Sequence, residues 1–255
     1  MKRYTLLIIV AFALVAPMRS MAQEQAEIWF EQANAAYNVG SYDSAVILYE
    51  KVAGAELESV ALYYNMGNAY YKTKDFPMAI YCYEKALKLD PSNDDVKTNL
   101  AIANMAVVDK IEPVPQSFIV KAWQGIRSWL SGDYWAWCSI AAFALLLWCL
   151  YLFLRGRSTG GRKFGFFMGI VLVVVFALSV TFAYQLKQQA EVRDQAIIMT
   201  PTVTVKSSPS DNSVDLFVLH EGSKISILES VDGWNKIKIA NGSVGWLKAD
   251  DMLPF

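Results

Sequence analysis

Two long segments without a charged side chain constrain this chain more than any other feature. Residues 135–154 form one such run, and residues 164–184 form a second. A helix of about 20 residues is about 30 Å long, which matches the hydrocarbon thickness of a bilayer. The whole sequence is 55% hydrophobic and only 18% charged, which exceeds the apolar share of an ordinary soluble domain. The sequence therefore predicts a pair of transmembrane helices.

The short link between these runs, residues 155–163, reads RGRSTGGRK and carries four basic residues and no acidic residue. Basic residues next to membrane spans remain on the cytoplasmic side. We therefore expect a cytoplasmic loop whose position is determined by Arg155, Arg157, Arg162 and Lys163.

Two catalytic readings of the same link are less favoured. GRSTG matches the G-x-S-x-G pattern of a hydrolase nucleophile elbow, but Ser158 has no strand before it. Gly156 and Gly161 have the spacing of a phosphate-binding loop, yet Arg162 follows where that loop requires lysine and then serine or threonine. We expect no catalytic site, and the protein is predicted not to be an enzyme.

Metal and disulfide chemistry have little support either. His220 is the single histidine, and neither a C-x-x-C nor an H-E-x-x-H spacing occurs. Cys82, Cys138 and Cys149 are spaced unlike a disulfide framework and are predicted to be packing residues. No metal and no cofactor is expected.

The first 22 residues read as a secretory signal peptide, and cleavage near Ala22 is favoured over the alternative of a retained anchor. A basic tip precedes a short apolar run, and Ser20-Met21-Ala22 forms a small-residue cleavage site. Export of the N-terminus and a cytoplasmic loop together place residues 23–130 and 185–255 outside the cytoplasm. We expect a protein of the bacterial inner membrane with both terminal domains in the periplasm.

Residues 26–93 repeat themselves at a period of 34. Residues at equivalent positions of the two units are similar. These pairs are Trp29 and Tyr63, Ala33 and Gly67, Tyr37 and Tyr71, Tyr42 and Phe76, Ala45 and Ala79, and Tyr49 and Tyr83. This period is typical of two-helix repeats. The second unit resembles the tetratricopeptide family at Tyr63, Met66, Gly67, Tyr70, Ala79, Tyr83, Ala86 and Pro91. We expect an all-α domain over 23–110, with helix pairs at 26–59 and 60–93 and a terminal helix at 94–108.

Helix pairs of this kind usually form a concave surface from their first helices. The predicted protein-binding groove is lined by Phe30, Asn34, Tyr37, Asn38, Tyr64, Asn68, Tyr71, Lys72 and Asn99. The alternative is a structural stack whose polar face is merely solvated. Family members that hold a carboxylate use basic residues, whereas the corresponding places here are Phe30, Asp95 and Asn99, so that mode of recognition is not expected.

Residues 116–131, between the repeats and the first apolar run, read as an amphipathic helix lying at the membrane surface. Ile119, Trp123, Ile126 and Trp129 share one helical stripe, while Arg127 lies off it.

The C-terminal segment 192–255 switches to short alternating runs separated by turn signals such as Asn241-Gly242, which predicts a small antiparallel barrel. It resembles bacterial Src-homology-3-like domains at Glu221-Gly222, Gly233-Trp234, Lys236-Ile237 and Gly245-Trp246-Leu247. That resemblance makes Lys206, Trp234 and Trp246 ligand candidates. Because so small a barrel needs large side chains inside, core packing is the favoured role of both tryptophans.

The predicted fold class is thus a multidomain membrane protein with tetratricopeptide helix pairs, a two-helix transmembrane hairpin and a small all-β barrel. This order resembles the BatE family of the aerotolerance operon of Bacteroides-type bacteria. The resemblance implies a non-catalytic scaffold whose protein partners are von Willebrand A domain membrane proteins and a MoxR-type ATPase. The alternative is a cell-envelope sensor that binds peptidoglycan through its barrel. Between Glu24 and Pro115 acidic residues outnumber basic ones by 14 to 7, so nucleic acid is not expected as a partner.

Overall fold

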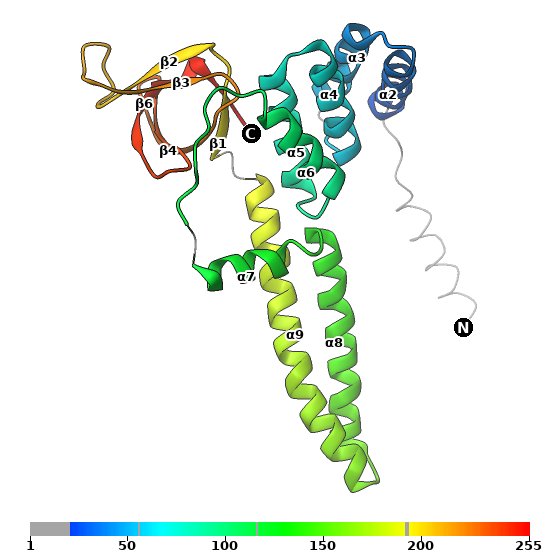
Figure 1. Ribbon diagram of the computed structural model, residues 1–255. Coiled ribbons are helices and arrows are strands. Elements are labelled where there is room, and N and C mark those ends of the chain that lie inside the picture. The colour runs from blue at the N-terminus through cyan, green and yellow to red at the C-terminus, as the bar shows by residue number, and fades with distance from the viewer. Residues whose placement is uncertain (1–20, 56, 116, 192–193) are drawn as a thin grey trace. The chain divides into compact units, whose positions relative to one another are not determined.

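The computed structural model describes residues 21–55, 57–115, 117–191 and 194–255 (Figure 1). The predicted signal peptide lies outside the described residues except for its last two. The chain divides into two compact units, one ending at Glu58 and one running from Ser59 to Phe255. Each unit is described by itself.

The first unit contains one helix pair, α2 (Met21–Asn38) and α3 (Tyr42–Gly54). Gly40 makes the turn between them with a φ of 81°, a left-handed conformation that glycine adopts without steric cost. Ala33 and Ala45 are both fully buried. Small residues at these places let α2 and α3 approach closely.

The second unit begins with three helices, α4 (Val60–Thr73), α5 (Phe76–Leu89) and α6 (Asp94–Asn104). Side chains of the preceding residues cap their first turns. Ser59 Oγ accepts a hydrogen bond from the amide of Leu62, and Asp75 Oδ1 accepts one from Met78, each at 3.1 Å. These caps satisfy amides that have no partner within the helix, so they fix where α4 and α5 begin.

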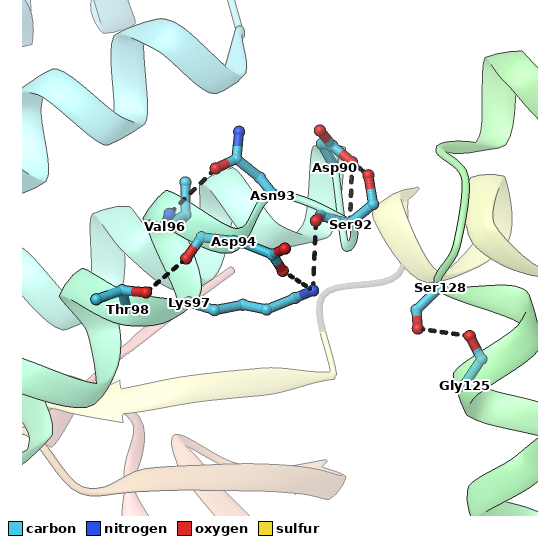
Figure 2. Close-up of polar contacts among 9 residues, drawn as sticks. All are labelled: Asp90, Ser92, Asn93, Asp94, Val96, Lys97, Thr98, Gly125 and Ser128. Atoms are coloured by element: carbon cyan, nitrogen blue, oxygen red, sulfur yellow. Dashed lines mark hydrogen bonds and ion pairs between the residues drawn. The ribbon is translucent and has the colours of Figure 1, made fainter.

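The turn from α5 into α6 is built from short polar side chains (Figure 2). Asp90 Oδ1 accepts hydrogen bonds from the amide and hydroxyl of Ser92, at 3.0 and 2.6 Å. Asn93 Oδ1 then caps α6 by accepting from the amide of Val96 at 3.1 Å. The turn brings α6 back against α5, where Val96 is fully buried.

A short helix and a long hairpin follow: α7 (Phe118–Arg127), α8 (Gly132–Arg155) and α9 (Thr159–Glu191). Ser128 ends α7 with a hydroxyl hydrogen bond to the carbonyl of Gly125 (Figure 2). Helices α8 and α9 lie side by side (Figure 1). Only residues 156–158 separate them, so Arg162 and Lys163 belong to the first turns of α9 rather than to the connecting loop.

Both long helices are long and apolar enough to cross a membrane. The candidate spans are Gly132–Arg155 and Thr159–Gln188, and only 11% of the most apolar window of each is buried within the protein. Helices that cover the core of a soluble domain bury a much larger share of their apolar surface. This exposure is the pattern expected of a surface that contacts lipid.

The C-terminal region forms one seven-stranded antiparallel sheet. Its strands are β1 (Gln195–Ile198), β2 (Thr202–Lys206), β3 (Asp215–His220), β4 (Lys224–Val231), β5 (Trp234–Lys238), β6 (Val244–Lys248) and β7 (Met252–Pro254). The order across the sheet is β3-β2-β6-β5-β4-β1-β7. One face carries the core, which includes Val205, Ile225, Ile237 and Leu247.

The prediction of an antiparallel β domain is confirmed, but the sheet is not closed into a barrel. Among the described residues, β3 and β7 are the two edges of the sheet and no ladder joins them. The sheet stays open because the first and last strands of the domain pair with each other. Strand β1 pairs with both β4 and β7, so the sheet extends beyond β4. Neither β1 nor β7 was singled out by the sequence pattern.

Candidate functional site

The same polar contact occurs in both helix pairs, 34 residues apart. In the first unit the hydroxyl of Tyr49 donates to Asn34 Oδ1 at 2.7 Å, and in the second the hydroxyl of Tyr83 donates to Asn68 Oδ1 at 2.7 Å. Both tyrosines are 1% exposed. A buried hydroxyl needs a partner, so each asparagine is placed by the packing of its own repeat.

Ring contacts follow the same period. Phe30 with Tyr49 and Tyr37 with Tyr42 in the first unit correspond to Tyr64 with Tyr83 and Tyr71 with Phe76 in the second, with centroid separations of 5.2 to 6.3 Å. The predicted groove residues Phe30, Tyr37, Tyr64 and Tyr71 are therefore half-buried parts of the repeat as well as candidates for binding.

Three predicted groove residues of the second unit meet directly. The side-chain nitrogen Nδ2 of Asn99, on α6, lies 2.8 Å from Asn68 Oδ1 and 3.3 Å from the hydroxyl of Tyr64. With Tyr83 these residues form a continuous network that ties α4, α5 and α6 together. The network gives Tyr64, Asn68 and Asn99 a structural role in addition to any role in binding.

The exposed groove candidates are Asn38 and Lys72, which occupy equivalent positions in the two repeats. Phe30, Asn34, Tyr37 and Asn38 belong to the first unit, and Tyr64, Asn68, Tyr71, Lys72 and Asn99 to the second. A continuous groove across both units stays a prediction.

The sheet carries a row of tryptophan and lysine side chains on the face opposite its core. Direct cross-strand pairs join Lys206 to Trp246, Trp246 to Lys236, and Trp234 to Lys248. We call these five residues the tryptophan–lysine face. Lys236 lies 6.0 Å above the ring of Trp246, and Lys248 lies 5.5 Å above that of Trp234, which are cation–π distances.

The expectation that Trp234 and Trp246 pack in the core is wrong. Each is half-buried, while the neighbours Asn235 and Leu247 point to the opposite, buried side. Successive side chains of a strand alternate between its faces, so the strand register that buries Ile237 and Leu247 turns both indoles outward. All three ligand candidates of this domain, Lys206 included, thus lie on one face.

Carboxylates neutralise part of this face. Asp215 pairs with Lys206 at 2.5 Å, and Glu229 lies 4.0 Å from Lys236. Lys248 bonds Asp211 at 2.7 Å, and that hydrogen bond raises the pKa of the Lys248 ammonium group. A carboxylate-bearing ligand would have to displace these partners in order to reach the lysines.

The end of the chain packs against the second helix pair. The buried ring of Phe255 contacts Tyr81 edge to face at 5.8 Å, and the ammonium groups of Lys88 and Lys224 lie 5.5 and 5.6 Å from it. Lys224 also pairs with Glu84 of α5 at 2.6 Å. Aromatic packing combined with a cross-domain ion pair connects α5 to the sheet.

The linker that follows α6 makes a second connection to the sheet. The carboxylate of Asp109 accepts a hydrogen bond from the amide of His220 at 2.7 Å and one from the hydroxyl of Ser223 at 2.6 Å. Val107 lies against Gly222 so closely that a Cβ there would be 2.8 Å from it. Further along, the amide of Val114 bonds the carbonyl of Ala240 at 3.1 Å. The linker is thus a strap across the β3–β4 and β5–β6 turns.

The contacts of the strap shift the pKa of the Asp109 carboxyl group. Burial raises the pKa of Asp109, but the hydrogen bonds from Ser223 and His220 lower it by more, and the result lies below the ordinary value of 3.8. His220, the one histidine of the sequence, is therefore a partner of Asp109 within this contact.

The serine of the GRSTG pattern has an ordinary structural partner. Ser158 Oγ accepts a hydrogen bond from the amide of Gly161 at 3.1 Å, which is the geometry of an N-terminal helix cap on α9. The predicted topology determinants Arg155, Arg157, Arg162 and Lys163 are all exposed around this turn.

Potential metal ligands do not gather anywhere in the described part of the chain: no three histidine, cysteine or acidic side chains form a group that could hold an ion. Cys82 and Cys149 are buried, Cys138 is half-buried, and all three are free thiols. The short distances described above are those of side-chain packing and of contacts between segments of the protein.

Comparison with known protein families found a match to one family. The tetratricopeptide repeat family matches residues 60–93, which are α4, α5 and the turn after them. A search of curated proteins gave no match. The chain thus contains a tetratricopeptide repeat, a type of unit that usually serves protein–protein interaction and not catalysis.

Proposed function

We propose that this protein is a non-catalytic, membrane-anchored scaffold whose tetratricopeptide repeats hold a protein partner. The observation that carries the proposal is the network of Tyr64, Asn68, Tyr83 and Asn99, which fixes α4 against α5 and α6 while Lys72 of the same helix stays exposed. A rigid helix face with an exposed polar edge is suited to hold a peptide or a protein surface.

The anchor in this proposal is the α8–α9 hairpin. Its exposed apolar surface supports insertion into a bilayer, and the basic turn at residues 155–163 supports a cytoplasmic position of that turn. We place the repeats and the C-terminal sheet in the periplasm of a bacterial inner membrane. Helix α7 and the turn after it, with Phe118, Ile119 and Trp129 strongly exposed, would lie in the membrane surface.

The whole-chain resemblance narrows the partner class within this proposal. It favours von Willebrand A domain membrane proteins and a MoxR-type ATPase, in a complex that serves aerotolerance or envelope stress tolerance. The partners are inferred from that resemblance alone, and the repeats supply the binding surface.

Introduction of negative charge at the equivalent positions Asn38 and Lys72 tests the binding surface. We expect Asn38→Glu combined with Lys72→Glu to reduce partner recovery in crosslinking and mass spectrometry of intact cells by at least tenfold. Lys51→Glu, an exposed charge reversal on the second helix of the first pair, is the matched control and should retain the partner. Equal recovery from all three proteins would contradict a groove on the first helices.

Thiol labelling tests the orientation. In a cysteine-free background, Ser158→Cys should react with a membrane-impermeant maleimide only after the cells are opened, whereas Ser208→Cys in the β2–β3 loop should react in cells with a permeabilised outer membrane. Both serines are exposed. Labelling of Ser158→Cys in cells whose inner membrane is intact would reverse the proposed topology.

The tryptophan–lysine face supports a second candidate function, a peptidoglycan-binding sensor. Indole rings flanked by ammonium groups can stack on sugars and pair with the carboxylates of wall peptides. Purified sacculi should then retain the full-length protein in detergent, and Trp246→Ala should release it while Trp137→Ala on α8 should not. Absence of retention by sacculi would remove this alternative and leave the scaffold proposal intact.

A further inference from the structure

A cavity of about 550 Å³ lies in the second unit where the two candidate spans meet α5. Lys88 and Leu89 at the end of α5 form one wall, the first turns of α8 form the second, and the last third of α9 forms the third. This volume falls in the range of pockets that hold small ligands.

The cavity wall changes from polar to apolar along the hairpin. Lys88, Ser131, Asp133 and Lys187 lie at the ends of the helices. Ala136, Ser139, Val180 and Ala183 lie further along the spans, and apolar atoms make up most of the lining. The hydroxyl of Ser139 donates to the carbonyl of Ala136 in its own helix at 2.7 Å. A ligand that fits this wall has a polar head and an apolar tail.

The position of the cavity along the candidate spans also favours a ligand with a polar head and an apolar tail. The candidate spans end at Gly132 on α8 and at Gln188 on α9, so the polar end of the cavity lies at the boundary of the apolar segments. Phospholipid headgroups occupy this level in a bilayer, above hydrocarbon chains about 30 Å thick. Lipid is therefore the ligand available at the highest concentration.

The charge of the lining favours an anionic head. Two lysines line the cavity against one carboxylate, that of Asp133. The 24-residue helix α8 begins at this wall, and among the described contacts the side chain of Ser131, its N-cap residue, makes no capping hydrogen bond. Helix N-termini and lysines both favour a phosphate group.

From this geometry we propose that the cavity binds the phosphate of an anionic phospholipid, with an acyl chain along Ala136, Val180 and Ala183. The proposal rests on the membrane insertion of α8 and α9. Gly132 lies close to α9 at this wall, because a Cβ at Gly132 would lie in van der Waals contact, 3.5 Å from Cβ of Leu186. A bound lipid would hold the hairpin against α5, so it would stabilise the connection between the anchor and the repeats.

Native mass spectrometry of the full chain in detergent tests the proposal. The probe is an equimolar mixture of phosphatidylglycerol and phosphatidylcholine. We expect preferential retention of phosphatidylglycerol, because each lysine near an anionic headgroup contributes about fivefold. Lys187→Gln should reduce the preference about fivefold, and Lys88→Gln with Lys187→Gln about 25-fold.

Two matched controls separate the cavity from general effects. Lys224→Gln removes the other ammonium group beside the Phe255 ring but does not line the cavity, and Lys163→Gln removes a basic residue at the opposite end of the hairpin. Both should retain the lipid. Ala136→Trp should fill the cavity and exclude the lipid, whereas Ala141→Trp, exposed on the same helix outside the cavity, should not.

Equal retention by the double lysine variant and the unaltered protein overturns the proposal. Displacement of phosphatidylglycerol by inorganic phosphate at a matched concentration overturns it too, because the site would then hold free phosphate. Alkaline extraction of the chain from membranes checks the anchor separately. A chain that resists extraction but shows no lipid preference retains its anchor and loses the lipid site.

Discussion

Asp109 and His220, which are 111 residues apart in sequence, are joined by two hydrogen-bonding contacts. The carboxylate accepts a hydrogen bond from the His220 amide at 2.7 Å, and its second oxygen lies 2.8 Å from the ring nitrogen Nδ1. An ionised carboxylate only accepts, so Nδ1 carries the proton in this contact. The linker after the repeats is thereby bound to the turn that begins β4.

Replacement of Asp109 should loosen this connection. Asp109→Asn leaves one oxygen where three donors converge, so we expect the free energy of unfolding to fall by about 1–3 kcal/mol. Thermal unfolding of the full chain in detergent measures the loss, and hydrogen exchange at residues 218–224 locates it. Asp211→Asn removes a carboxylate of an exposed pair with Lys248 and should cost much less, because solvent screens that pair. Equal losses from the two variants would contradict the role of the strap.

Acidification should release the same connection. The folded pKa of Asp109 lies below the ordinary value of 3.8, so its contribution to stability is complete above that value. The contribution disappears as the pH falls through the lower, folded pKa. We expect exchange protection of the β3–β4 turn to decline below about pH 4 in the unaltered protein. In Asp109→Asn the turn should lack this step, and an identical pH profile in both proteins would argue against the assignment.

Gly67 is packed against the ring of Tyr83. A Cβ at Gly67 would lie 2.7 Å from Cε1 of that buried ring, so Gly67→Ala requires the ring or α4 to move. We expect a loss of about 1–3 kcal/mol in the free energy of unfolding. Gly54→Ala should be neutral or stabilising in the same thermal measurement. Apart from its chain neighbours and its own helix backbone, no atom of the described residues lies within 4 Å of the added Cβ.

Gly165 lies at a close approach of α8 and α9. A Cβ there would lie 2.6 Å from the carbonyl oxygen of Cys149 and 3.0 Å from the amide nitrogen of Phe153. Backbone contact of this kind stabilises helix pairs in membranes. Gly165→Val should therefore lower the thermal stability of the hairpin in detergent and increase proteolysis at residues 156–158. Gly160→Val, with open space around its Cβ, should leave both measurements unchanged.

Local periodicity accounts for what the sequence predicted well. The period of 34 placed Tyr49 and Tyr83 in equivalent surroundings, and the structure gives both the same asparagine partner. The helical repeats, the two apolar helices and the antiparallel strands are all present. The Asn34–Tyr49 and Asn68–Tyr83 hydrogen bonds themselves could have been found in the sequence, since both pairs occur at the same spacing of 15 residues.

Predictions that depended on which face of an element is buried were less successful. Trp234 and Trp246 are large and apolar, so composition alone assigned them to the core. The register of β5 and β6 instead buries Ile237 and Leu247 on the other face. The sheet likewise stays open because β1 and β7 pair with each other at one edge.

The sequence alone predicted the features that repeat or persist along the chain: the helix pairs, the apolar runs, the basic turn and the alternating strands other than β1 and β7. Only the tertiary structure decided which distant segments meet, namely Asp109 with His220, Tyr81 with Phe255, and the end of α5 with the start of α8. The physical reason is that the spacing of apolar residues shows only that one face of a helix or strand is buried. It carries no information about the partner, because apolar surface gains similar free energy against any surface that excludes water.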